Sequence, residues 1–244
     1  GHRGCLVIRS ARGRLCADIS NTDPAYEKQG AFGIAKEKFE MRVLDCLVLK
    51  DATDLKAAQE AAQLTNEFTK KSHKVLAQAA VNKKRIQEGK VPANVILARD
   101  AGDKLPKFPP LSEQYKIKFA SLVEMPVERG IALLTGMHIV DVPSQSGHLD
   151  VDYGVWLKVA LENIKDFDGL YIHIKGPDEP AHDGDFKKKK EIIEAIDKFF
   201  FGPLLKKKDV LAQSLICVTA DHSTVCKIKA HSADPVPLLI SGPG

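Results

Sequence analysis

The chain has 244 residues, of which 44% are hydrophobic and 28% are charged, the balance of an ordinary globular protein. Lys and Arg number 36 against 32 Asp and Glu, and 6% of the residues are aromatic, so a weak positive charge and few stacking side chains argue against nucleic-acid binding. No apolar segment reaches membrane-spanning length, no secretory signal is visible, and the five cysteines lack CxxC spacing, so we expect a cytoplasmic protein with reduced thiols and no membrane partner.

The first part of the chain is expected to form one domain over residues 1–110. Its apolar runs at 5–10 and 93–99 predict two strands, the second of them buried. Between these runs, from residue 54 to residue 88, apolar side chains recur at helical spacing, which predicts one bent helix or two. The stretch AGDKLPKFPPLSEQY, rich in Gly, Pro and charge, follows the second run and predicts a domain boundary near residue 110.

Strand and helix patterns alternate through the second expected domain, residues 111–244. The predicted strands are 118–125, 137–143, 169–175 and 214–220. The predicted helices are 126–136, 150–164 and 185–200. This alternation predicts an α/β fold, a mostly parallel sheet with helices on both faces. The helix residues expected to face the core are Val155, Trp156, Val159, Ile193, Ile196 and Phe200.

Two clusters of Asp and His side chains follow predicted strands. Asp178 and His182 lie in KGPDEPAHDGDF after the third strand, and Asp221, His222 and His231 come after the fourth. Ligands bind outside the carboxyl ends of strands in such sheets. Adjacent side chains at a strand end tend to point apart, so Asp221 and His222 are expected to serve different ions of a metal pair.

The alternative is that these polar residues only cap helices and form turns. For Asp183 and Asp185, just before the helix that begins at Phe186, capping is the favoured interpretation because Asp is a preferred N-cap. For the five residues of the two clusters, taken together, we favour metal binding. Carboxylate and imidazole ligands without thiolate suit Mn²⁺ best, with Zn²⁺, Co²⁺ or Mg²⁺ as alternatives.

Long stretches of the chain resemble one family, the archaeal-type cofactor-independent phosphoglycerate mutases of the alkaline phosphatase superfamily. The resemblance is carried by HIKGPDEPAHDGDF, IDKFFFGPLL, ICVTADHST and KAHSADPVPLLISG, and upstream by GHRGCLVIRS, ISNTDPAY, PANVILARDAG, MPVERGIALLTGM and VPSQSGHLDVDY. It covers essentially the whole chain. It implies an alkaline-phosphatase-like α/β core over residues 111–244 and a smaller inserted α/β domain, which clamps the substrate, over residues 1–110.

The resemblance also implies two divalent metal ions and a phosphoglycerate substrate. Asp178, His182 and His231 would hold one ion, and Asp221 and His222 would hold the other. The metals would activate a nucleophile and neutralise the charge that develops during phosphoryl transfer.

Further residues are implied at the substrate. Lys175, the candidate catalytic residue, would approach the phosphate or carboxylate, and His2, Arg3 and Arg99 would clamp the anion, since guanidinium groups bind such groups bidentately. Asp23 in NTDP is a candidate acid–base group at the substrate, with a turn before proline as the alternative that its position favours. The chain has RDAG where the family reads RGAG, which places a carboxylate beside Arg99.

The implied reaction interconverts 3-phosphoglycerate and 2-phosphoglycerate through a phosphoserine, in glycolysis and gluconeogenesis. The family carries the nucleophilic serine and an early metal-binding Asp in an N-terminal segment that we do not recognise here, so we expect a fragment, poorly soluble or inactive by itself. The first alternative is another phosphomutase or phosphohydrolase of the alkaline phosphatase superfamily, which would share these metal ligands. The second is a metal-binding fragment without catalysis.

Overall fold

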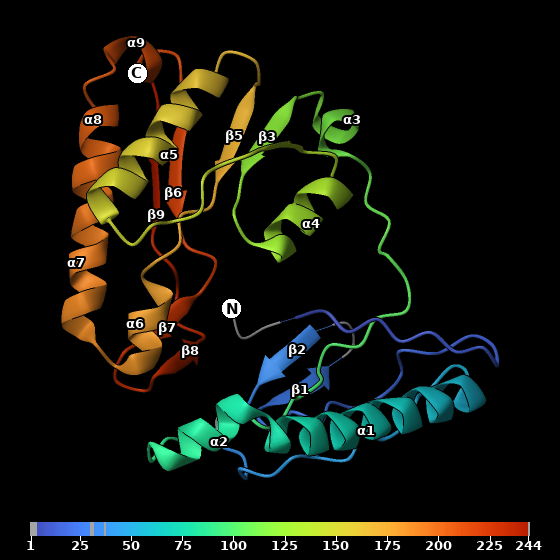
Figure 1. Ribbon diagram of the computed structural model, residues 1–244. Coiled ribbons are helices and arrows are strands. Elements are labelled where there is room, and N and C mark those ends of the chain that lie inside the picture. The colour runs from blue at the N-terminus through green and yellow to red at the C-terminus, as the bar shows by residue number, and fades with distance from the viewer. Residues whose placement is uncertain (1–3, 30–31, 37, 244) are drawn as a thin grey trace. The chain divides into compact units, whose positions relative to one another are not determined.

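Two units divide the chain, Gly1–Leu105 and Pro106–Gly244 (Figure 1). The structure is a computed structural model and describes residues 4–29, 32–36 and 38–243. The Gly- and Pro-rich stretch that follows residue 100 lies at the junction of the two units.

The first unit contains a short hairpin and two helices. Strands β1 (Tyr26–Gln29) and β2 (Phe32–Ala35) pair antiparallel. Helix α1 (Leu55–Gln78) is followed by α2 (Ala80–Gln87), because Ala79 between them adopts an extended conformation. Of the two expected possibilities, the separate helices are therefore the correct one.

The expected strands at 5–10 and 93–99 are wrong, since neither run is a strand in the described residues. In the second run, the backbone N–H of Ala98 donates to the side-chain hydroxyl of Thr22 at 2.8 Å, and the N–H of Thr22 donates back to the Ala98 carbonyl. A side chain thus takes the place of a strand partner. The apolar residues of this run, Val95, Ile96 and Leu97, are exposed rather than buried.

The core of the first unit lies along the alanine-rich face of α1. Ala58, Ala61 and their neighbours on this face pack against Ile19 and Cys46. The small side chains let the loop segments approach the helix closely, and an isolated bridge between Ile19 and Val48 joins two of these segments.

The second unit is built around a parallel sheet with the strand order β4-β3-β5. The three strands are β3 (Phe119–Leu122), β4 (His138–Val140) and β5 (Gly169–Ile172). In Figure 1, β3 and β5 lie between α5 (Leu149–Asn163) on one side and α4 (Pro126–Leu134) on the other. The expected α/β fold with a parallel sheet is confirmed.

Within the described residues, the remaining strands of the second unit do not join this sheet by hydrogen bonds. β6 (Ile216–Thr219) forms where the fourth strand is expected, but it pairs antiparallel with β9 (Leu238–Ser241). β7 (Ser223–Val225) and β8 (Ala230–Ser232) form a further antiparallel pair. The second unit also contains α3 (Leu111–Tyr115), α6 (Asp178–Asp183), α7 (Phe186–Ile196), the π-helical turn η1 (Asp197–Phe201), α8 (Gly202–Leu204) and α9 (Lys208–Leu211).

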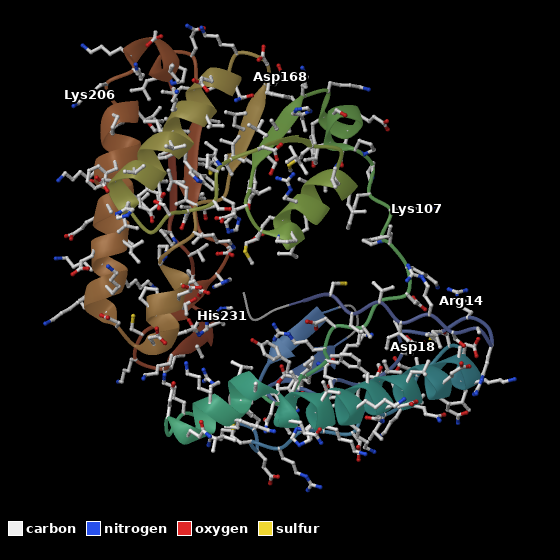
Figure 2. All side chains as sticks on the ribbon, viewed as in Figure 1. Arg14, Asp18, Lys107, Asp168, Lys206 and His231 are labelled. Atoms are coloured by element: carbon white, nitrogen blue, oxygen red, sulfur yellow. The ribbon has the colours of Figure 1, made fainter. Side chains whose placement is uncertain are left out.

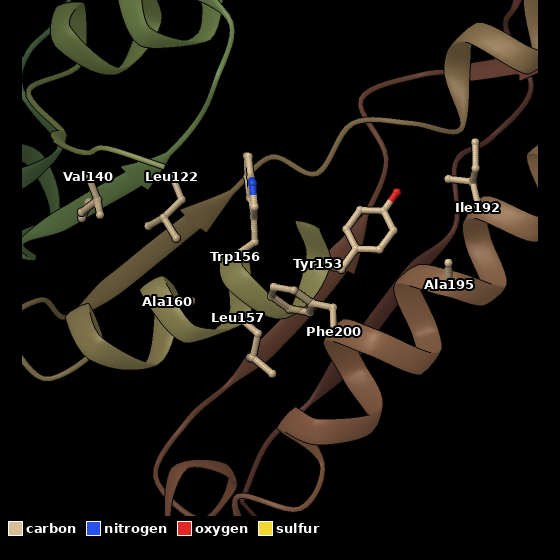
Figure 3. Close-up of a cluster of buried hydrophobic side chains, with 10 residues drawn as sticks. Leu122, Val140, Tyr153, Trp156, Leu157, Ala160, Ile192, Ala195 and Phe200 are labelled. Carbon is tan, nitrogen blue, oxygen red and sulfur yellow. The ribbon is translucent and has the colours of Figure 1, made fainter. Parts of the chain in front are cut away.

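The core of the second unit lies where α5 packs against the sheet and against α7 (Figure 3). Trp156 is buried there as expected, and Val159 packs against the edge of the cluster. Val155 does not belong to it. The buried face of α5 instead consists of Asp152, Tyr153, Trp156, Leu157 and Ala160.

The expected stripe on the following helix is shifted by one residue. Ile192 and Ala195 are buried, whereas Ile193 is 49% exposed, and Ile196 is only partly buried. Phe200 is buried as expected because the wider turn of η1 brings it back toward the side of Ile192. Among the helices of the described residues, none is both long enough and apolar enough to cross a membrane.

Candidate metal centre

Three segments of the second unit meet at the candidate site. The chain leaves β5 through a short loop into α6, leaves β6 toward Asp221 and His222, and returns through the β7–β8 hairpin that carries His231 (Figure 2). Helix α6 contacts β7 and α7. The loop before α6 needs Gly176, whose φ is 135° and whose added Cβ would lie 2.8 Å from the Ile192 side chain.

Asp178, His182 and His231 bring three ligand atoms together. His182 Nε2 lies 3.4 Å from Asp178 Oδ1, His231 Nε2 lies 3.5 Å from the same oxygen, and the two ring nitrogens are 3.2 Å apart. Asp178 and His182 face the same way because they are one helical turn apart in α6. Two imidazole nitrogens and a carboxylate oxygen that converge in this way fit a divalent transition metal.

A hydrogen bond on the side of the ring away from the cluster fixes the orientation of His182. Its Nδ1 lies 3.1 Å from the backbone carbonyl of Lys229. A carbonyl only accepts hydrogen bonds, so Nδ1 carries the hydrogen and Nε2 keeps a free lone pair. Such an outer partner is typical of metal-ligating histidines.

Asp221 and His222 lie beside the three-ligand cluster. The His222 ring stacks on the His231 ring with centroids 3.7 Å apart, so the structure brings all five predicted metal residues together. The expectation that Asp221 and His222 point apart is wrong, because Asp221 Oδ2 lies 3.5 Å from His222 Nε2. The backbone bends at Asp221, and the His222 N–H donates to Asp221 Oδ1 at 3.1 Å.

Asp183 and Asp185 lie outside the cluster of ligand atoms. Asp185 is the N-cap of α7, and its carboxylate accepts the backbone N–H of Lys188 at 2.9 Å, which confirms the capping interpretation for this residue. Asp183 is the last residue of α6.

Neighbouring charges and burial shift the pKa values of two residues in the cluster. Burial raises the pKa of Asp178, but the hydrogen bond from Thr224 and the nearby histidines outweigh burial and lower this pKa. Burial, followed by the neighbouring His222, lowers the pKa of His231. Near neutral pH the carboxyl group is therefore ionised and the His231 ring neutral, which are the forms that bind metals.

Lys175 lies beside polar side chains that were not predicted as part of the site. Its Nζ lies 2.6 Å from Oε1 of Glu128, near the start of α4. His173 Nε2 lies 3.9 Å from the same Glu128 oxygen and 4.0 Å from Asp221 Oδ2, and His173 Nδ1 is 2.8 Å from the Tyr171 hydroxyl. The signal for two of these side chains is in GLYIHIK, where Tyr171, His173 and Lys175 alternate with apolar residues, although β5 itself ends at Ile172.

The other expected substrate residues belong to the first unit. Asp23 accepts the backbone N–H of Ala25 at 3.0 Å, which is the turn that its position favours. Arg99 stacks over the ring of Tyr26, 3.7 Å from the centroid, and its Nε lies 3.5 Å from Oδ2 of Asp100. The expected clamp residues His2 and Arg3 lie outside the described residues.

Comparison with known proteins gives the family. The model of the Metalloenzyme superfamily matches residues 37–244. The chain belongs to this superfamily. Membership agrees with the convergence of carboxylate and imidazole ligands in the second unit.

Relatives extend the comparison over the whole chain. A protein of Aeropyrum pernix named 2,3-bisphosphoglycerate-independent phosphoglycerate mutase is 42% identical over 99% of this chain and 57% of its own length. A protein of Ignicoccus hospitalis with the same name is 34% identical over 99% of this chain and 53% of its own length. These names confirm the resemblance found in the motifs, and the chain spans about half the length of the curated relatives it matches.

A solved structure supports the fold. The PH0037 protein from Pyrococcus horikoshii is 34% identical, with a TM-score of 0.61 over 76% of this chain and 48% of that protein. Most of this chain therefore resembles an experimentally determined architecture.

Proposed function

We propose that this chain is part of a 2,3-bisphosphoglycerate-independent phosphoglycerate mutase of the cytoplasm, which interconverts 3-phosphoglycerate and 2-phosphoglycerate. The observation that carries the proposal is the convergence of Asp178, His182 and His231 on one point, in a chain similar over its whole length to enzymes with that name. The five free cysteines support the cytoplasmic location, where thiols stay reduced.

In this proposal the five metal residues divide between two divalent ions. Asp178, His182 and His231 hold one ion, and Asp221 and His222 contribute to the other, for which Mn²⁺ is favoured by the carboxylate and imidazole ligands. When bound, the ions supply a Lewis acid that stabilises the attacking and leaving oxygens of phosphoryl transfer.

The remaining site residues act on the substrate anion. Lys175 offers an ammonium group to the phosphate or carboxylate, and Glu128 holds that ammonium in place through the 2.6 Å contact. In the first unit Arg99 presents a planar guanidinium group that the Tyr26 ring supports from one side. Asp23, His2 and Arg3 complete the proposed substrate residues, and residues 1–110 form the proposed inserted domain.

Metal binding can be tested on this chain directly. We expect Mn²⁺ to bind in calorimetric titration, and His182→Ala to weaken this binding by more than about tenfold, since loss of a ligand should cost at least as much as loss of an outer partner. His148→Ala is the matched control, because His148 is exposed and lies outside the cluster. Equal Mn²⁺ affinity in both variants would contradict the assignment.

The reaction itself requires the protein that contains this chain. We expect conversion of 3-phosphoglycerate to 2-phosphoglycerate without added bisphosphoglycerate, lost with a chelator and restored with Mn²⁺. Release of inorganic phosphate without isomerisation would assign a phosphohydrolase instead. Metal binding without either reaction would leave a non-catalytic metal protein.

A further inference from the structure

Thr224 lies between the two proposed ligand sets of the metal centre. The first set is Asp178, His182 and His231, and the second is Asp221 and His222. It is the middle residue of β7, and only 6% of it is exposed. Its hydroxyl oxygen lies 2.6 Å from Asp178 Oδ1 and 3.1 Å from His222 Nδ1. Across the hairpin Thr224 is the register partner of His231. A single hydroxyl group therefore touches one residue from each set and sits opposite a third ligand.

The hydroxyl group has one hydrogen to donate, and its two contacts compete for that hydrogen. An ionised carboxylate can only accept, and 2.6 Å is a typical length for a hydroxyl that donates to a carboxylate. The hydrogen of Thr224 therefore points to Asp178. The contact with His222 must then be made by an N–H on Nδ1 of the ring, which donates to the hydroxyl oxygen.

We propose that Thr224 is a positioning residue that orients Asp178 and selects the His222 tautomer in which Nε2 is free to bind a cation. The inference rests on the proposed metal binding of these residues. Thr224 itself does not contact the ion or the substrate in this account. It acts by aligning one ligand from each set through the same hydroxyl group.

The backbone around Thr224 is held independently of its hydroxyl group. Lys189 of α7 donates through Nζ to the Thr224 carbonyl at 2.7 Å, and the pairing with β8 holds the strand from the other side. Thr224→Val keeps the branched shape of the side chain and suits a strand, so it removes the hydroxyl group while these contacts remain. A change at the metal centre can then be separated from loss of the fold.

The first measurement uses the metal-free chain. At mildly alkaline pH, where imidazoles are neutral, nitrogen-15 NMR distinguishes the two tautomers of the His222 ring. We expect the wild type and Thr224→Ser to carry the hydrogen on Nδ1, and Thr224→Val to move it largely to Nε2. Ser223→Ala, whose hydroxyl group donates to the Asp234 carbonyl and contacts neither ligand, is the matched control and should behave as wild type.

The second measurement is the dissociation constant for Mn²⁺. Thr224→Val should raise it about 10- to 100-fold, the usual cost of losing an outer partner of a metal ligand, and Thr224→Ser should recover most of the affinity. Unchanged affinity and an unchanged His222 tautomer in Thr224→Val would overturn the inference. If the wild type binds no Mn²⁺, the proposed metal function fails, and the tautomer of the metal-free chain still decides the role of Thr224.

Discussion

Asp18 of the first unit anchors the loop before α1 (Figure 2). Its Oδ2 accepts the backbone N–H and the hydroxyl of Thr53 at 2.9 and 2.8 Å, and Cys16 Sγ lies 3.1 Å away. The backbone hydrogen bond from Thr53, followed by the side-chain bonds from Cys16 and Thr53, lowers the pKa of Asp18 to about 2. The ionised carboxylate therefore joins the segment that contains Cys16 to the loop before α1.

This pKa predicts a pH-dependent contribution of Asp18 to stability. The folded pKa is below the unfolded value of 3.8, so the contribution is fully present above that value and is lost as the pH falls toward 2. In urea unfolding, we expect Asp18→Asn to be less stable than wild type at neutral pH, with a difference that shrinks through this acidic range. A difference that stays constant with pH would show that ionisation of Asp18 does not matter.

Single residues of the site differ in how well the sequence predicts them. Asp178 and His182 are predicted because they follow a predicted strand, and the turn of α6 that brings them together was not predicted. The sequence contains no comparable signal for Thr224 or Glu128, since their partners lie in segments far along the chain. Their roles depend on how α4, α6 and β7 meet, which local spacing does not encode.

At the scale of elements, α7 shows why a helical stripe can be misassigned by one residue. A regular period groups Ile193 and Ile196 with Phe200 in the sequence, yet η1 widens the last turn and changes the phase of Phe200. Ile192 is then the residue that enters the core, at 7% exposure. Hydrophobic periodicity predicts that the helix exists, but the irregular turn that follows it breaks the regular spacing between α7 and Phe200.

The stripe on α7 can be tested by a pair of neighbouring substitutions. Ile192→Ala should reduce the free energy of unfolding by about 2–4 kcal/mol, since it removes buried carbon atoms from a packed core. Ile193→Ala, at 49% exposure, should change it by less than about 1 kcal/mol. Urea unfolding followed by the fluorescence of Trp156, the single tryptophan of the chain and a member of the same core, reports both. Equal losses would contradict the assigned stripe.

Apolar runs predict strands less reliably than helical spacing predicts helices. The runs that become β3, β4 and β5 follow helices closely, so each finds a parallel neighbour in the same sheet. The runs at 5–10 and 93–99 are also apolar, but neither is a strand, and in the second run the backbone groups of Ala98 bond to Thr22 instead. Apolar composition indicates that a segment can be a strand, and only an available partner makes it one.

At the scale of the whole molecule, the alternating second unit is the part that sequence patterns describe well. Strand–helix alternation fixes the direction of neighbouring strands, and the carboxyl ends of β5 and β6 both lead to predicted metal ligands. The first unit has only α1 and α2 as strong patterns, while its four-residue strands are too short to show a clear alternation. Local signals are strong only where elements are long or regularly repeated.

The exposed sheet formed by β6 and β9 leads to a prediction about association of the chain. All four residues of β9 are exposed, including Leu238 at 66%, and within the described residues this strand pairs with β6 alone. An exposed apolar strand with a free edge is a template for pairing with another chain. We therefore expect this chain to self-associate at high concentration in light-scattering measurements.

Substitution with lysine separates the strand from a general effect of charge. Leu238→Lys should shift the chain toward the monomer, because a charged side chain on the strand disfavours edge-to-edge pairing. Val81→Lys adds the same charge at a similarly exposed apolar position, 63% exposed on α2, where no strand edge is present, and should leave association unchanged. If both variants dissociate equally, net charge rather than β9 controls association, and the exposed strand is not the contact.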